Sequence, residues 1–185
     1  MIQRSDTWRS LLDAATDHIA RNGPDAPLRA ICDQAGVRLP TLYHFFGDKQ
    51  GLLDAVLDAC LERYLDHKRG LEPTGDVRTD LRRGWDLHIG FVRAHPRIHP
   101  LLFPPGSAAA RRSLEPLRAG FEHLARTGTL RPGLTAEVAT RSLSSALRGV
   151  ATTISLDPDR RDNLKLSTTV RDAVIDALLN RRRTT

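Results

Sequence analysis

The segment GVRLPTLYHFFGDK, from Gly36 to Lys49, constrains the fold of this chain more than any other part of the sequence. It opens with a glycine turn and a proline, and its centre, TLYHFF, brings three aromatic residues and a histidine into six positions. The whole chain contains only two Tyr and five Phe residues. A fully buried helix would not need polar groups here, and a flexible loop would not need apolar ones. The segment therefore predicts a short helix that is anchored on one face and exposed on the other.

The two faces of this helix, over about 39–45, follow from the spacing of its side chains. Leu42, Phe45 and Phe46 face inward and pack the helix against its neighbours. The other side chains face outward, where they can contact another molecule: Leu39, Pro40, Thr41, Tyr43 and His44.

Glycine and proline also delimit the elements before this helix. A first helix begins near Ser5 and ends before Gly23-Pro24, and a short second helix over about 27–34 begins at a proline. Ala35-Gly36-Val37 then forms a tight turn, where a sharp reversal often uses a left-handed glycine. Three helices of which the last two are joined by a glycine turn form the helix-turn-helix pattern, whose last helix enters the DNA major groove.

The rest of the chain is also predicted to be helical. No run of alternating apolar and polar residues is long enough to predict a strand. Further helices are predicted over about 48–68, 77–94, 108–126 (which Pro116 can kink), 135–154 and 166–182. The fold class is therefore all-α, with an N-terminal helix-turn-helix domain over residues 1–50 and a helical domain over 51–185. The helix at 48–68 connects the two.

The charge of the chain favours a polyanionic partner, with nucleic acid first. The formal net charge is +6 and the isoelectric point about 10.1. Within residues 1–50, however, six basic and six acidic residues sum to zero. The excess positive charge lies after residue 50, partly in the tail Arg181-Arg182-Arg183. Net charge alone therefore does not locate a DNA-binding site, and the positions of individual charged residues must do so.

The sequence is also typical of a cytoplasmic protein. The N-terminus has no apolar segment of the kind found in secretory signals, and no apolar run approaches the length of a membrane span. Cys32 and Cys60 lie in apolar helical patterns, which suits buried thiols better than a disulfide.

A set of residues in fixed order carries a family resemblance: Ala14-Ala15, Gly23, Ile31, Ala35-Gly36-Val37, Thr41-Leu42-Tyr43, Phe45-Phe46, Lys49 and Leu52-Leu53. With these residues, the stretch over 10–57 resembles the N-terminal domain of the tetracycline-repressor (TetR) family of bacterial transcriptional regulators. The resemblance implies a ligand-responsive DNA-binding regulator, and it favours a repressor that binds a near-palindromic operator as a homodimer.

The resemblance also implies which residues contact double-stranded DNA. Arg29 would reach a base edge or a phosphate, and Lys49 a phosphate. Two positions depart from the family pattern: Pro27 stands where members often have Thr or Ser, and Arg38 replaces a small polar residue. The base-reading set would be Arg38, Leu39, Pro40 and Thr41, with Tyr43 and His44 mostly on phosphates.

Aromatic and histidine residues of the C-terminal part are candidates for the pocket of a small-molecule effector. An apolar stripe at helical spacing is more often core, so packing is the favoured interpretation of each residue taken alone. The candidate set is Trp85, His88, Phe91, His99, Phe103 and Phe121.

Two apolar stripes on the last two helices are candidates for the dimer interface, where they would form a four-helix bundle with their symmetry mates. The alternative is that they pack within one subunit. The first stripe contains Leu143, Leu147, Val150 and Ile154, and the second Val170, Val174 and Leu178.

No cofactor, metal or catalytic residue is predicted. His95 and His99 are four residues apart, but no nearby Cys, Asp or Glu completes a zinc site. Short signatures of hydrolases, phosphate-binding loops and dinucleotide-binding loops do not occur. The alternative function is a helical enzyme or an adaptor that uses the three-helix unit for protein contact.

Overall fold

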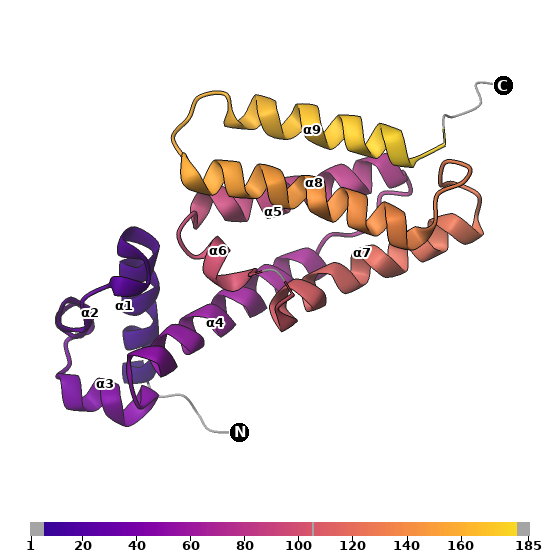
Figure 1. The fold of residues 1–185 in the computed structure, drawn as a ribbon. Helices are drawn as coiled ribbons and strands as arrows, with labels where there is room; N and C mark the ends of the chain where they lie inside the picture. Colours follow the sequence, from indigo (N-terminus) through magenta and orange to yellow (C-terminus); the bar gives the residue numbers. More distant parts are fainter. Residues whose placement is uncertain (1–5, 105, 181–185) are drawn as a thin grey trace.

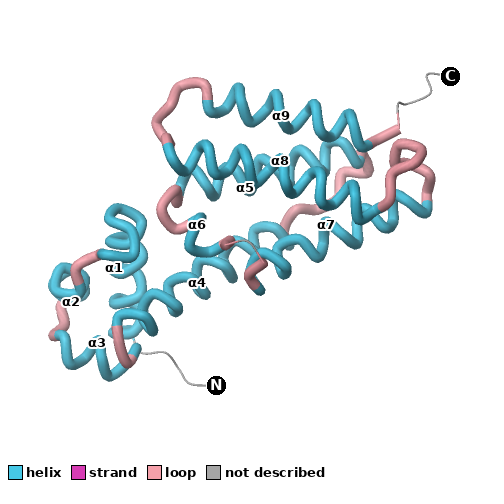
Figure 2. Tube along the Cα trace, in the orientation of Figure 1, coloured by secondary structure: helices cyan, strands magenta, loops and turns pink. Residues whose placement is uncertain are grey.

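The computed structural model describes residues 6–104 and 106–180, and its regular elements are helices apart from one isolated bridge between Leu130 and Leu179 (Figures 1 and 2). This confirms the all-α prediction. The α-helices are α1 (Asp6–Asn22), α2 (Leu28–Ala35), α3 (Leu39–Phe46), α4 (Lys49–Arg69), α5 (Val77–Ala94), α6 (His99–Leu102), α7 (Ala108–Arg126), α8 (Ala136–Leu156) and α9 (Asn163–Leu178), with a 3-10 turn at Gly23–Asp25.

Helices α1 to α3 form a small bundle at one end of the molecule, which we call the head (Figure 1). Gly36 joins α2 to α3 with a φ angle of 68°, a left-handed conformation that costs glycine no steric strain. Leu11, Ala15 and Leu42 are fully buried between the three helices. The head is therefore a packed unit, and its helices have fixed relative positions.

Helix α4 runs from the head into the larger bundle (Figure 1). The Asp48 carboxylate caps it by accepting a hydrogen bond from the Gly51 amide at 2.7 Å. Its apolar residues extend one continuous core from Leu52 beside the head to Tyr64, which lies in the same core as α6 residue Leu102. Because α4 contributes to this core along its length, a movement of the larger bundle can reach the head through it.

Helices α5, α7, α8 and α9 form the larger bundle, which we call the body (Figure 1). Its core includes Val92 and Ile154, both fully buried. The Trp85 indole N–H donates to the Ser167 hydroxyl at 2.9 Å and ties α5 to α9. Both stripes that the sequence identified on the last two helices therefore reach into this core.

Most predicted helix boundaries agree with the observed ones to within two residues, and the larger differences concern α6 and α9. Helix α6 was not among the predicted helices, because four residues give no readable periodicity. Helix α9 begins at Asn163, three residues before the predicted 166, because the Asn163 amide donates to the Asp157 carbonyl and fixes the preceding turn. Helix α9 ends at Leu178, four residues before the predicted 182, because Leu179 is extended and forms the bridge with Leu130. The predicted start of the first helix at Ser5 and the tail Arg181-Arg182-Arg183 lie outside the described residues.

Two further expectations concern thiols and membranes. Cys32 and Cys60 are both free and buried, and burial raises the pKa of each thiol. Over the described ranges, none of the helices combines the length and the apolar character that a membrane crossing requires.

Candidate nucleic-acid interface and ligand pocket

Helix α3 changes from buried to exposed between adjacent residues. Leu42 is 0 % exposed and holds the helix on the head core, whereas Tyr43 is 46 % exposed and His44 is also exposed. Phe45 and Phe46 are half-buried and pack against the same core. The helix thus presents a phenol and an imidazole outward from a rigidly seated backbone.

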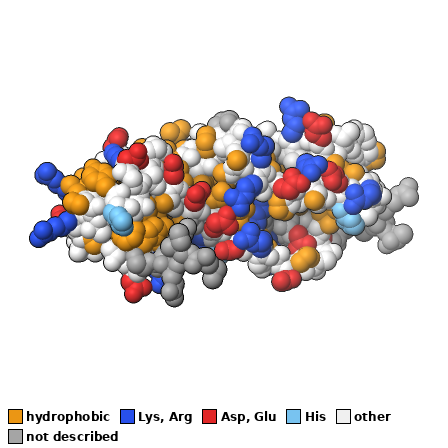
Figure 3. Space-filling view, turned by 90° about the horizontal axis from the view of Figure 1, so that it is seen from below, with side chains coloured by type: hydrophobic (Ala, Val, Ile, Leu, Met, Phe, Trp, Pro, Cys, Tyr) orange, Lys and Arg blue, Asp and Glu red, His pale blue; other side chains and the backbone are white. Residues whose placement is uncertain are grey.

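The other residues implied in DNA contact lie around this helix. Arg29, Arg38 and Pro40 are exposed, and Leu39 and Thr41 are half-buried. Figure 3 shows Lys and Arg side chains projecting from the end of the molecule that the head forms. These positions leave the set free to meet a duplex, and their roles in DNA contact remain predictions.

Lys49 lies at the start of α4, where its ammonium is 3.8 Å from the Asp25 carboxylate. Both side chains are largely exposed, so the pair contributes little to stability. A phosphate could therefore compete with Asp25 for this lysine at small cost.

Gly51, in the first turn of α4 beside the head, is a structurally important residue that was not predicted. A Cβ atom built on Gly51 would lie 2.0 Å from the Phe46 carbonyl oxygen, far inside van der Waals contact. Only glycine lets the first turn of α4 approach the end of α3 so closely. Its backbone φ is not left-handed, so no turn signature in the sequence could have indicated it.

The body contains a cavity of about 480 Å³ enclosed by α4 to α8, within the range of small-molecule sites. Four of the six predicted pocket residues line it: Trp85, His88, His99 and Phe103. Two lining residues of α4, Tyr64 and Lys68, were not predicted, because their sequence positions suggest one core residue and one surface residue of a connecting helix.

A hydrogen-bonded chain of three side chains forms one wall of the cavity. The Tyr64 hydroxyl lies 3.0 Å from Nδ1 of His88, and Nε2 of His88 lies 3.2 Å from Nε2 of His99. Burial lowers the pKa of His88 to about 3, helped by the charges of His99 and Lys68, and burial lowers the pKa of His99 to about 4. Burial raises the pKa of Tyr64, so all three side chains of this hydrogen-bonded series are neutral at neutral pH. It offers hydrogen bonds and no charge.

Two of the predicted pocket residues lie elsewhere. Phe121 is 1 % exposed and belongs to the core of the body, where the apolar stripe of α7 meets its neighbours. Phe91 lines a separate, smaller cavity of about 230 Å³ beside His95. Its ring packs against Tyr64 and Phe103, so it supports the wall of the larger cavity from behind.

The candidate dimer residues also need correction, because most of them are covered within one chain. Val150, Ile154 and Leu178 are buried in the core of the body. Leu143 is buried and Leu147 is half-buried, and both line the cavity. The remaining two, Val170 and Val174, are half-buried and pack against the same core.

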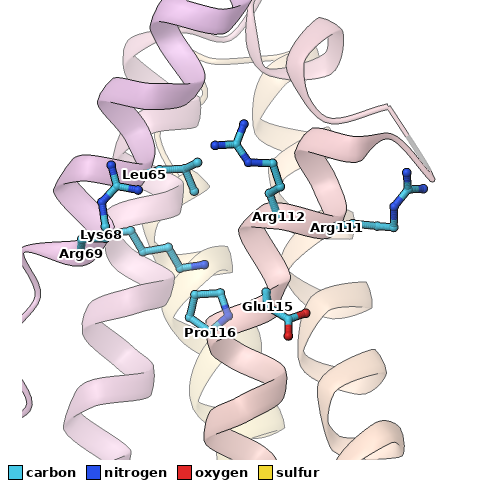
Figure 4. A pocket seen from close by; sticks show the side chains of 7 residues that line it. All are labelled: Leu65, Lys68, Arg69, Arg111, Arg112, Glu115 and Pro116. Carbon is cyan, nitrogen blue, oxygen red and sulfur yellow. The ribbon is translucent and has the colours of Figure 1, made fainter.

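A groove between α4 and α7 adjoins the cavity, and Lys68 and Pro116 line both (Figure 4). In Figure 4 the Lys68 side chain reaches from α4 toward Pro116, and Arg111 points away from the space between the helices. Arg112 pairs with Glu62 at 2.7 Å, and Arg69 pairs with Asp66. The described part of the chain contains no cluster of three His, Cys, Asp or Glu side chains that could hold a metal, and His99 faces His88 and not His95.

Comparison with known proteins shows which family the head resembles. Residues 11–56 match the family model described as bacterial regulatory proteins, tetR family. The fold of the whole chain is similar to that of solved regulators at low sequence identity. A TetR transcription regulator from Haloarcula marismortui is 23 % identical with a TM-score of 0.75, over 95 % of this chain and 99 % of that one.

Two regulators named FadR share the same fold. The fatty acid degradation regulator from Bacillus halodurans is 21 % identical with a TM-score of 0.71, over 91 % of this chain and 97 % of that one. The FadR from Bacillus subtilis, solved in complex with stearoyl-CoA, is 19 % identical with a TM-score of 0.68, over 92 % and 98 % of the two chains.

Proposed function

Because this chain is a TetR-family protein, we propose that it is a transcriptional repressor that binds a near-palindromic operator as a homodimer and changes its operator affinity when a small molecule enters the body. The observation that carries the proposal is the exposed face of α3. Leu42 seats the helix with no exposed surface, and the adjacent Tyr43 and His44 project from it. A rigid helix with outward hydrogen-bonding groups suits insertion into a major groove.

The proposed division of roles follows from chemistry. Arg38 lies just before α3 and would donate two hydrogen bonds to a guanine edge, with Thr41 offering its methyl group to thymine. Tyr43 and Lys49 would contact phosphates, which fixes register without reading sequence. Arg29 on α2 would reach the duplex from beside the recognition helix.

The first test replaces Tyr43 and Arg38 with alanine. Duplexes selected from a random library by the wild-type protein would serve as probes in fluorescence anisotropy titrations. Tyr43→Ala is expected to weaken binding to all selected sequences alike, whereas Arg38→Ala should cost about 1–3 kcal/mol and relax the preference at one base pair. Arg126→Ala, an exposed arginine at the far end of α7, is the matched control. Unchanged affinity for both head variants would refute the assigned face.

Salt separates this function from the alternative of an adaptor or a helical enzyme whose head contacts protein. Binding through several phosphates releases counterions, so affinity should fall steeply as salt rises. Contact through an apolar face would show no such slope.

The dimer proposal is supported by the distribution of exposed apolar side chains. Apart from Tyr43, the exposed large apolar residues of the described chain all lie on α8 or α9: Val138, Leu156, Leu164 and Leu166. Leu156 is 82 % exposed at the end of α8. Small exposed residues lie between the two ends of α8, among them Ser145 and Gly149, and would let two helices approach closely. This face replaces the buried stripes as the proposed interface.

Gly149→Arg tests that interface. A Cβ atom built on Gly149 meets nothing within 4 Å in the single chain, and the position is exposed, so the monomer has room for a side chain there. Across a two-fold axis the two new guanidinium groups would face each other. Their bulk and like charge would separate the helices and weaken dimerisation by several kcal/mol. Sedimentation equilibrium should show a monomer with unchanged helical circular dichroism, while Gly90→Arg on α5 remains dimeric. A dimeric Gly149→Arg protein would place the interface elsewhere.

The cavity and α4 support the proposed response to ligand. The FadR of Bacillus subtilis has the same fold and was solved with a bound acyl-CoA, which supports an effector in the body of this chain. Helix α4 lines the cavity at Tyr64 and contacts the head core at Leu52. A tenfold change in operator affinity requires about 1.4 kcal/mol of differential ligand binding between two states.

A further inference from the structure

The lining of the cavity is mostly apolar, and few charged groups reach it. Trp85, Phe103, Leu117 and Leu147 contribute apolar surface from α5 to α8. Three charged side chains also line it: Lys68, Asp80 and Arg148. The histidine pair adds no charge, because both imidazoles are neutral at neutral pH.

Two of these three charges are already occupied or solvated. The Asp80 carboxylate accepts hydrogen bonds from the amide and the hydroxyl of Thr74, at 2.9 and 2.7 Å. Arg148 is exposed, so water solvates its guanidinium. Lys68 is therefore the charge that faces a ligand inside the cavity.

Lys68 differs from its basic neighbours in lacking an acidic partner within residues 6–104 and 106–180. The guanidinium of Arg112 pairs with Glu62, and that of Arg69 pairs with Asp66. The Lys68 ammonium instead donates to the backbone carbonyl of Ser113, one turn before Pro116 on α7.

One hydrogen bond to a neutral carbonyl leaves the ammonium incompletely satisfied. A lysine ammonium has three N–H donors, and the described hydrogen bonds use one. Its other described contact is with the face of the Tyr64 ring, whose centroid lies 5.9 Å away. Burial lowers the pKa of Lys68 to about 8, so the group is still mostly charged at neutral pH. A partly buried cation without an anion is costly, and an acidic ligand group would offset that cost.

We propose that the effector is an amphipathic anion, whose apolar part fills the cavity and whose acidic group binds the Lys68 ammonium at the opening between α4 and α7. The groove outside that opening is lined by three arginines and one acidic residue, so the acidic end would point toward a surface with more basic than acidic groups: Arg69, Arg111, Arg112 and Glu115 (Figure 4). The neutral Tyr64–His88–His99 chain would bind an uncharged polar group of the ligand. This inference rests on the proposed ligand response and specifies the chemistry of the ligand.

The experiment compares molecules that share one apolar chain and differ in the head group. Decanoate and decyl phosphate carry an acid, decan-1-ol is neutral, and decyltrimethylammonium is cationic. Isothermal titration calorimetry on the full-length protein should show that at least one acid binds about tenfold or more tightly than the alcohol, as a charge-assisted hydrogen bond requires. The cation should bind most weakly. A difference between the two acids identifies whether the site takes a carboxylate or a phosphate.

Substitutions at Lys68 assign that preference to one side chain. Lys68→Gln keeps a donor for the Ser113 carbonyl and removes the charge, so the acids should fall to the affinity of the alcohol. Lys68→Arg should retain the preference, and so should Arg112→Gln, whose guanidinium already has a partner. Thermal unfolding verifies that each variant is folded.

Three outcomes would overturn the inference: wild-type protein that binds the alcohol as tightly as both acids, an acid preference that survives in Lys68→Gln, or no binding of any probe. Operator binding is measured separately with the Tyr43 and Arg38 variants. If those variants bound the operator as tightly as the wild type, the proposed function would be refuted. If only the calorimetric predictions failed, the chemistry assigned to the effector would be refuted and the proposed function would stand.

Discussion

Replacing Gly51 with alanine is expected to destabilise the head by about 3 kcal/mol or more, which is a large part of the stability of a typical domain. The added Cβ would lie 2.0 Å from the Phe46 carbonyl oxygen. That oxygen belongs to the backbone, so no side-chain rotation can relieve the contact, and α3 and α4 must separate. The separation would also break the hydrogen bond from the Gly51 amide to Asp48.

Urea unfolding followed by circular dichroism measures this loss, and operator affinity should fall with it. Gly90→Ala is the matched control, because Gly90 lies within α5 and an added Cβ there meets nothing within 4 Å. That substitution should stabilise the protein by about 0.5–1 kcal/mol, since alanine is the better helix former. Equal effects of the two substitutions would contradict the close approach of α4 to Phe46.

The head was the most predictable part of the fold, because its elements are short and bounded by residues with strong local preferences. Gly36 requires a left-handed backbone and Pro40 suits a first helical turn, so the helices on either side could be placed to within one or two residues. The alternation of Leu42 with Tyr43 then indicated which face of α3 is exposed. Local steric rules were sufficient here.

The partners of the body helices were less predictable, since periodicity shows that a stripe is buried and does not show what buries it. The stripe of α8 was predicted to face a second subunit, but Val150 and Ile154 are covered by the same chain and Leu143 lines its cavity. Helix α8 packs against α5, α7 and α9, which uses the whole stripe. Leu156 is exposed, but nothing in its sequence context distinguishes it from a buried leucine, so it was not predicted as an interface residue.

Lys68 illustrates the same limit for the candidate ligand site. In the sequence it is one basic residue among several near the end of a charged helix, followed directly by Arg69. Only the packing of α7 against α4 shows that its ammonium meets the Ser113 carbonyl, while neighbouring guanidiniums meet carboxylates. The difference depends on tertiary contacts between residues 45 positions apart, which no local pattern records.

Phe121 and Phe103 provide a direct test of which aromatic residues are core and which belong to the cavity. Both were predicted pocket residues, but Phe121 is 1 % exposed in the body core, whereas Phe103 is half-buried and lines the cavity. Phe121→Ala should lower the free energy of unfolding by about 3–5 kcal/mol, as expected when a fully buried ring leaves a void. Phe103→Ala should cost about 1–2 kcal/mol, because less of its surface is buried.

For ligand binding the order of the two effects should be reversed, with Phe103→Ala causing the larger loss of affinity. Phe103→Ala removes a wall of the cavity and should weaken binding of the tightest decyl probe severalfold, whereas Phe121→Ala should leave the affinity of the folded fraction unchanged. Chemical denaturation and calorimetry on the same two variants measure both effects. If Phe121→Ala weakened the probe more than Phe103→Ala, or if Phe103→Ala were the more destabilising, the assignment of Phe121 to the core and of Phe103 to the cavity would have to be reversed.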